Sequence, residues 1–157
     1  LRKNLLEGTL KADGSHRLSA GLNASYIYTH ARVPLATHPG GSQLEGAAPW
    51  IVNADVSEHI RLRRAEITAT VVLNYFSDRV YTIGTEGYQD IIENGIPTLD
   101  LVLSARLAAR WDIGLKARNL LNPAHSLTRK GNATNAETVL SRYRKGADLS
   151  LGISYTL

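Results

Sequence analysis

The sequence predicts an all-β protein built from antiparallel strands. Three observations predict this class: strict period-two alternation, a regular exchange of short and long connections, and the absence of any apolar run near the ~18 residues of a membrane-spanning helix. The clearest alternation runs from Tyr143 to Leu157, where odd positions are mostly apolar and even positions are polar or glycine. Successive side chains of a strand point to opposite faces, so this segment is predicted to be a strand with one apolar and one polar face.

The same alternation recurs in six earlier segments, which brings the predicted number of strands to seven. These segments are Leu5–Ala12, Leu18–Thr29, Trp50–Ser57, Thr68–Tyr75, Leu99–Ala108 and Trp111–Arg118. The region around the second of them, Arg17–Arg32, is long enough to exceed the ~9–11 residues with which a tilted strand crosses a bilayer.

Short and long connections alternate between these strands. Short turns are predicted at Asp13–Ser15, Glu58–Arg64 and Ala108–Arg110, and long Gly/Pro/Asn-rich loops at Val33–Pro49, Ser77–Ile96 and Asn122–Arg142. Short turns at one end of a sheet and long loops at the other are typical of outer-membrane barrels, whose long loops lie outside the cell.

Aromatic residues stand near the ends of the apolar faces, where interfacial girdles of membrane barrels lie. They are Trp50, Tyr75, Trp111, Tyr143 and Tyr155. With the long strands and a polar face rich in Gly, Ser, Thr and Asn, this predicts an antiparallel transmembrane β-barrel in the bacterial outer membrane. A soluble β-sandwich binding module is the alternative that the alternation alone leaves open.

Seven strands are an odd number, whereas single-chain bacterial barrels normally have an even one. An open sheet in lipid would also leave unpaired backbone groups at its edges, each at a cost of several kcal/mol. We therefore expect residues 1–157 to be one portion of a larger barrel domain. The chain begins Leu-Arg-Lys-Asn, with no initiator Met and no signal-like apolar segment, which indicates a processed product or a fragment.

Five phrases carry a family resemblance. They are Leu44–Pro49 (LEGAAP), Tyr75–Ser77 (YFS), Thr98–Asp100 (TLD), Lys116–Asn122 (KARNLLN) and the terminal run from Tyr143, which ends in Leu157 where the family usually has Phe. In order and spacing they resemble the C-terminal third of TonB-dependent outer-membrane receptors, 22-stranded barrels with a plug domain in the lumen.

The resemblance implies energy-coupled uptake of a scarce nutrient, such as a ferric siderophore, haem, cobalamin or an oligosaccharide. Its implied partners are outer-membrane lipid, the plug domain of the same receptor, the TonB complex, the barrel-assembly machinery and the small-molecule nutrient. A small complete eight-stranded barrel of the OmpA type, with a structural or adhesion role, is the alternative function; it needs an eighth strand.

Seven charged residues fall on the polar phase of the predicted strands. Two readings stay open for them: solvation by lumen water, or contact with the plug domain that the resemblance implies. These residues are Asp55, Glu66, Asp100, Arg106, Asp112, Lys116 and Arg118.

The last apolar phase is predicted to face lipid and to form the terminal signal for barrel assembly. Its residues are Leu149, Leu151, Ile153, Tyr155 and Leu157.

Two of the long loops hold candidate ligand-binding residues, because Arg and Tyr are common binding anchors; ordinary solvated loop residues are the other reading. The candidates are Arg79, Tyr81, Tyr88, Gln89, Asp90, His125 and Arg129, with Lys130 beside them.

No catalytic, cofactor or metal site is predicted. The chain has no cysteine, and its five histidines show no ligand spacing. Its net charge of +4 is scattered, and the densest cluster, Arg61, Arg63 and Arg64, is interpreted as a solvated turn and not as a nucleic-acid site. Asn119–Pro123 is interpreted as the end of a strand, because Asn tolerates turn geometry and Pro cannot donate to a ladder. Asn132–Thr134 matches a glycosylation pattern but carries no weight in a bacterial loop.

Overall fold

The computed structural model describes the backbone of residues 2–11 and the complete residues 15–32, 40–131 and 136–157. Within these ranges the chain is all-β and every strand pairing is antiparallel, which confirms the predicted class. No helix in this part of the chain is long and apolar enough to cross a membrane.

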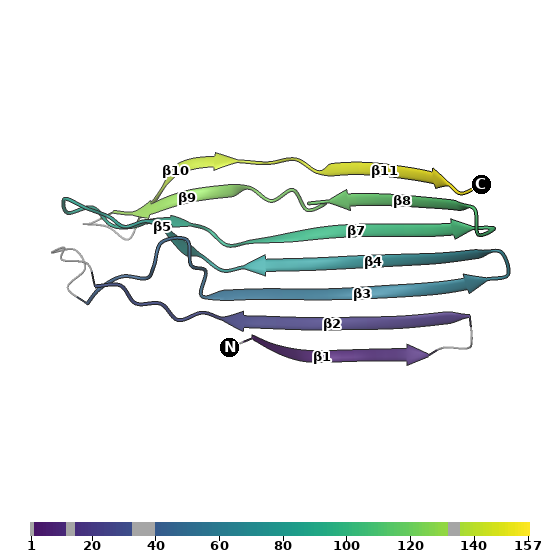
Figure 1. Ribbon diagram of the computed structural model, residues 1–157. Helices are drawn as coiled ribbons and strands as arrows, with labels where there is room; N and C mark the ends of the chain where they lie inside the picture. The colour runs from purple at the N-terminus through teal and green to yellow at the C-terminus, as the bar shows by residue number, and fades with distance from the viewer. Residues whose placement is uncertain (1, 12–14, 33–39, 132–135) are drawn as a thin grey trace.

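The main sheet has seven strands, which lie side by side in chain order (Figure 1). All seven predicted strands belong to it. They are β1 (Arg2–Lys11), β2 (His16–Tyr26), β3 (Trp50–Leu62), β4 (Ala65–Phe76), β7 (Ile96–Leu107), β8 (Trp111–Arg118) and β11 (Asp148–Tyr155).

The pairing register keeps every apolar phase on one face of this sheet. Because a slip of one residue would move a strand's whole apolar set to the other face, the register is the property that makes the face continuous. One row of paired positions crosses from β2 to β11 and consists of Ala20, Val56, Val71, Leu101, Ala117 and Leu149.

The main sheet is a single layer. Its strands contact mainly their neighbours within the sheet, and apolar side chains such as Leu149 and Leu151 are 72% and 67% exposed. The buried apolar side chains of the described residues are few: Ala48, Val80, Ile96 and Ala117. Neither face of the sheet is therefore covered by a second layer of the described chain.

Two loops that the sequence predicts to be irregular form a second sheet, so that prediction was wrong. The segments Ser77–Ile96 and Asn122–Arg142 contain β5 (Arg79–Thr82), β6 (Ile91–Glu93), β9 (His125–Lys130) and β10 (Glu137–Tyr143), paired in the order β10-β9-β6-β5. We call this the extension sheet. It continues the main sheet beyond β4, β7, β8 and β11 (Figure 1). Its strands are three to seven residues long. Strands this short, in segments rich in Gly, Pro and Asn, give no clear alternation of apolar and polar residues in the sequence.

The terminal strand is shorter than predicted. β11 begins at Asp148, and Tyr143 ends β10. The break arises at Gly146, which has a left-handed φ of 86° that glycine adopts without steric cost. Gly146 N donates to Asn122 Oδ1 (3.0 Å), and Asn119 Nδ2 donates to Gly146 O (2.6 Å).

The same contacts explain the Asn-rich phrase after β8. Asn119 and Asn122 have φ angles of 55° and 42°, a conformation that Asn tolerates better than most residues. β8 ends at Arg118, directly before them. The interpretation of Asn119–Pro123 as the end of a strand is confirmed.

Other boundaries differ by a few residues. β2 ends at Tyr26, not Thr29, and β3 extends to Leu62, so the turn predicted at Glu58–Arg64 contains only Arg63 and Arg64. The predictions for Asp13–Gly14, Asn132–Thr134 and the first part of the Val33–Pro49 loop, and one of the five histidines (His38), lie outside the described residues.

The turn between β7 and β8 contains a strained pair of alanines. Ala108 and Ala109 have φ angles of 49° and 57°, and Arg110 N donates to Leu107 O (3.1 Å). Where both central residues of a hairpin turn have a positive φ, Asn and Gly are favoured at those two positions. Ala108→Asn combined with Ala109→Gly should raise the free energy of unfolding by about 1 kcal/mol, measured by urea titration of the folded protein. The same pair of substitutions at Arg63 and Arg64, which have no positive φ, should bring no gain; an equal gain there would contradict the explanation.

Candidate functional site

The seven predicted polar-phase charges lie on one face of the main sheet, which we call the polar face. The pairing register places them there together, because each charged residue lies opposite a polar-face residue of the neighbouring strand. They fall in three rows across the sheet. The first row contains Glu66, Arg106 and Asp112, the second Lys116, and the third Asp55 and Asp100. Arg118 follows the Leu101–Ala117 pair on the side of Asp100 and pairs with Asp148.

The first row forms a network of alternating charges at the short-turn end. Arg61 Nε lies 3.0 Å from Glu66 Oε1, and Arg106 Nε lies 2.7 Å from Asp112 Oδ1. Glu66 and Arg106 are paired positions on β4 and β7. The network thus links β3, β4, β7 and β8, although its side chains are substantially exposed, so solvent screens each pair and its contribution to stability is small.

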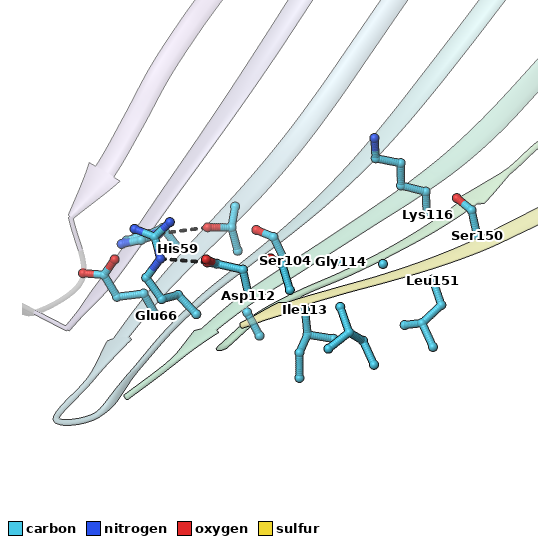
Figure 2. Close-up of a pocket in the computed structure, with 15 residues that line it drawn as sticks. His59, Glu66, Ser104, Asp112, Ile113, Gly114, Lys116, Ser150 and Leu151 are labelled. Carbon is cyan, nitrogen blue, oxygen red and sulfur yellow. Dashed lines mark hydrogen bonds and ion pairs between the residues drawn. The ribbon is translucent and has the colours of Figure 1, made fainter. Parts of the chain in front are cut away.

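Glu66, Arg106 and Asp112 of this row line a cavity of about 690 Å³ on the polar face. Figure 2 shows Lys116 and Ser150 on one side of the strands and Ile113 and Leu151 on the other. Gly114 and Gly152 lie opposite each other on β8 and β11, so the floor there is bare backbone. Lys116 has no ion pair among the described residues. The cavity therefore presents the Lys116 ammonium group near the hydroxyl groups of Ser104 and Ser150.

Hydroxyl and imidazole groups also bridge the strands on this face, both at the cavity and beside it. Ser57 Oγ lies 2.9 Å from Thr70 Oγ1, and His59 Nδ1 lies 3.0 Å from Thr68 Oγ1. In the third row the Asp100 carboxylate accepts from Asn119 N (2.8 Å). The polar face is therefore well hydrogen-bonded within itself, which the sequence pattern alone does not show.

The predicted ligand residues divide into two groups in the extension sheet. Arg79 is engaged internally: its guanidinium contacts Glu93 Oε2 at 2.7 Å, donates to Gly46 O (3.3 Å) and lies over the Phe76 ring. Asp90 accepts from Gly84 N (2.7 Å). These two residues stabilise the loop fold, and their side chains have partners already.

His125 is also built into the extension sheet. It is 8% exposed, its ring is stacked on Tyr143 with centroids 5.1 Å apart, and its Nδ1 lies 4.0 Å from Glu93 Oε1. Tyr143, predicted to border the apolar face, instead serves this stack. Glu93 thus joins Arg79 and His125, residues that are 46 positions apart in the sequence.

The remaining candidates are more accessible. Tyr81 and Tyr88 are 53% and 57% exposed, and Gln89 is exposed. The Arg129 guanidinium lies 5.2 Å from the centroid of the Tyr88 ring, and its buried Nε has no hydrogen-bond partner in the described part of the chain. Tyr81, Tyr88 and Gln89 are the predicted residues with surface to offer a ligand.

Sequence reasoning missed Glu93 and Thr128. Thr128 is buried and its hydroxyl donates to Asn94 Oδ1 (3.0 Å). A carboxylate and a hydroxyl in short segments carry no periodic signal, so only the strand pairing of β6 with β9 reveals them.

The His125 environment predicts a pH-dependent extension sheet. Burial, and then the Lys145 charge, lower the pKa of His125 below its ordinary value, against the opposing effect of Glu93. The unfolded segment therefore binds a proton more readily, so stability is complete above pH ~6.5 and is lost as the pH falls below it. The protection factors of the β9 and β10 amides, which are exchange rates corrected for the intrinsic rate at each pH, should be lower at pH 5 than at pH 7.5. His125→Gln should remove the difference; an unchanged pH dependence in that variant would assign it to another group.

The predicted assembly residues follow the expected phase. Leu149, Leu151, Ile153 and Tyr155 all lie on the apolar face of β11, and Leu157 follows the strand. β11 is an edge strand that pairs only with β8.

In the described residues no group of three or more His, Cys, Asp or Glu side chains is placed to hold a metal ion. Comparison with protein-family models, curated proteins and solved structures found no match to this chain.

Proposed function

We propose that this chain is one side of the wall of a bacterial outer-membrane β-barrel, in a receptor of the TonB-dependent type that takes up a scarce nutrient. In this proposal the apolar face of the main sheet contacts lipid and the polar face lines the lumen. The long connections face the cell exterior and the short turns face the periplasm.

The observation that carries the proposal is an uncovered apolar face bordered by aromatic side chains at both ends. At the long-loop end Tyr26 and Trp50 lie with ring centroids 4.7 Å apart. At the short-turn end Trp111 and Tyr155 form a matching pair, also at 4.7 Å. Amphipathic rings are stable at the headgroup level, so two such borders are expected of a wall that spans a bilayer.

The distance between the borders fits a membrane. On β4, Ala65 belongs to the same row of paired positions as Trp111 and Tyr155 and so marks the short-turn border. Tyr75, which pairs with Val52, lies ten residues further along β4 and marks the other border. At ~3.3 Å per residue this is roughly 33 Å along the strand. A tilt of ~35–45° reduces it to about 25 Å along the membrane normal, the height of the apolar band of known barrels.

One polar pair interrupts the apolar face of the described strands. Glu58 lies beside His16, with Oε1 and Nδ1 3.2 Å apart. Acidic residues cost less than Arg or Lys on a lipid-facing barrel surface, and the hydrogen bond lowers the cost further. The pair is therefore compatible with lipid contact.

The receptor part of the proposal rests on the family resemblance. The phrase Lys116–Asn122 stands where β8 ends and turns, and Thr98–Asp100 stands near the start of β7. Exposed Tyr81 and Tyr88 in the extension sheet provide surface for the nutrient, and the Lys116 side of the polar face provides surface for a plug domain. The test is uptake by cells that carry the whole polypeptide: import should stop when the proton-motive force is dissipated while surface binding persists. Import that continues would exclude energy coupling.

The two tryptophans test the membrane placement directly, because Trp50 and Trp111 are the only ones in the chain and stand at opposite borders. In the single-tryptophan variants Trp50→Phe and Trp111→Phe, reconstituted in bilayers, each remaining indole should be quenched most by lipids brominated near the headgroup. If quenching is strongest for bromine at the acyl-chain ends, the aromatic borders do not lie at the headgroup level and their assignment is wrong. No quenching in either variant would indicate a sheet that does not contact lipid.

The small eight-stranded barrel is distinguished by assembly of the 157 residues alone. A complete small barrel requires an eighth strand that closes the main sheet between β1 and β11, and the described residues contain no such strand. Expressed by itself with a secretion signal, the chain should fail to form a heat-modifiable, protease-resistant species, since two sheet edges would stay unpaired in lipid. Stable assembly of the isolated chain would favour the small barrel.

A further inference from the structure

Two short turns meet at the periplasmic end of the proposed wall and form a cleft rich in arginine. The β3–β4 turn and the β7–β8 turn are joined by a hydrogen bond from Ala108 N to Arg64 O (2.7 Å). Between them lies a cavity of about 600 Å³. Its charged lining consists of Arg61, Arg63, Arg64, Arg106 and one carboxylate, Glu66.

Positive charge in this cleft is not fully compensated. Glu66 pairs with Arg61, and Arg106 pairs with Asp112. Arg63 and Arg64 have no ion pair among the described residues and lie exposed in the turn. Ala108 and Ala109 complete the lining with no more than a methyl group each, so a bulky anion can approach the guanidinium groups. Planar guanidinium groups bind phosphate oxygens in a bidentate manner.

Arg61 and Arg106 reach the cleft from the polar face, whereas Arg63 and Arg64 in the turn lie next to an apolar row on the opposite face. Leu62, Leu107, Trp111 and Tyr155 belong to one row of paired positions on the apolar face, and they are 36–53% exposed. The surface thus changes from apolar to strongly cationic within a few residues. This order matches an acyl chain followed by a phosphate, and neither a free phosphate nor a nucleic acid would use the apolar row.

We propose that this cleft binds the phosphate headgroup of an anionic phospholipid from the leaflet at the short-turn end. Arg63 and Arg64 contact the phosphate from the turn, while Leu62 and Trp111 contact the acyl chains. The inference relies on the proposed membrane placement of the sheet, but it adds a specific lipid site that the placement alone does not require.

The test is native mass spectrometry of the detergent-purified protein titrated with phosphatidylglycerol, cardiolipin or zwitterionic phosphatidylethanolamine, and with glycerol phosphate as the soluble source. The wild type should bind the two anionic lipids in preference to the others. An arginine near an anionic membrane surface contributes about fivefold in affinity. Arg63→Gln combined with Arg64→Gln should therefore weaken anionic-lipid binding about thirtyfold.

The matched control is Arg142→Gln combined with Arg144→Gln, which removes the same charge from exposed residues at the other end of the molecule. It should leave lipid binding unchanged. Equal loss of lipid binding in both double variants would show that only the net charge matters and would overturn the proposal. Binding of glycerol phosphate as strong as that of the anionic lipids would also overturn it. So would binding of the protein to duplex DNA together with no preference among the lipids.

Tryptophan quenching in bilayers keeps the two proposals separable. If Trp50 and Trp111 are quenched near the headgroups but anionic lipid is not selected, the lipid site is wrong and the membrane wall stands. If neither tryptophan is quenched, the membrane placement itself fails.

Discussion

Leu151→Arg should prevent assembly of the protein in the outer membrane, whereas Ser150→Arg should assemble at nearly the wild-type level. Leu151 lies on the apolar face of β11, four residues from the Tyr155 border, and is 67% exposed. An arginine facing lipid near the midplane costs about 2–4 kcal/mol. Ser150 is the adjacent residue on the polar face, next to Lys116 (Figure 2), where a guanidinium group stays hydrated.

The measurement is the fraction of the whole polypeptide that is heat-modifiable and protease-resistant in isolated outer membranes. The two variants differ by one position and carry the same new side chain, so expression and net charge are matched. Equal assembly of both would show that the two faces do not differ in their surroundings. Loss of assembly in both would indicate that the terminal strand tolerates no charge on either face.

Glu93→Gln should unfold or loosen the extension sheet without affecting the main sheet. Glu93 is the carboxylate shared by Arg79, at 2.7 Å, and by His125, at 4.0 Å, and its side chain is only 14% exposed. Removing its charge leaves the Arg79 guanidinium without a counterion in a partly buried position. Charge-assisted hydrogen bonds of this kind contribute about 1.5–3 kcal/mol each, so we expect a local loss of about 2–3 kcal/mol, moderated by the partial exposure of Arg79.

Hydrogen exchange resolved by segment measures this loss: amides of β5, β6 and β9 should exchange faster and those of β3 and β4 should not change. The control is Glu137→Gln, the same change at an exposed position of β10, which should leave exchange as it is in the wild type. Faster exchange throughout both sheets would show that the extension is not an independent unit. If the exposed tyrosines bind a nutrient as proposed, Glu93→Gln should also weaken that binding while the amount of protein at the cell surface stays equal.

The strands of the main sheet and their two faces could be predicted from the sequence, because apolar and polar side chains alternate every residue along a strand. All seven alternating segments lie in strands of the main sheet, and the phases predicted for the six segments after the first are correct within β2, β3, β4, β7, β8 and β11. The charges predicted to share a face do share it. The Asn-rich end of β8 was also predictable, because the left-handed φ of Asn119 and Asn122 reflects a local preference of that side chain.

The extension sheet was not accessible in this way. β5 and β6 contain four and three residues, too few for a period to emerge from the surrounding Gly and Asn. The pairing of β5 with β6 and of β6 with β9 depends on where β4 and β8 end and where β7 begins, and these positions are set by the assembled main sheet. The ion pair of Arg79 with Glu93 and the stack of His125 on Tyr143 follow from that pairing.

By itself, the sequence determined the fold class, the number of strands in the main sheet and which side chains lie on each face, because all three follow from alternation and turn chemistry along a continuous stretch of chain. Only the tertiary structure decided that the loops form strands, that Arg79, Asp90 and His125 have internal partners, and that the arginines of two separate turns line one cleft. Those contacts join residues from strands that the sequence does not order relative to one another, so they depend on the lateral pairing of strands and on no local preference.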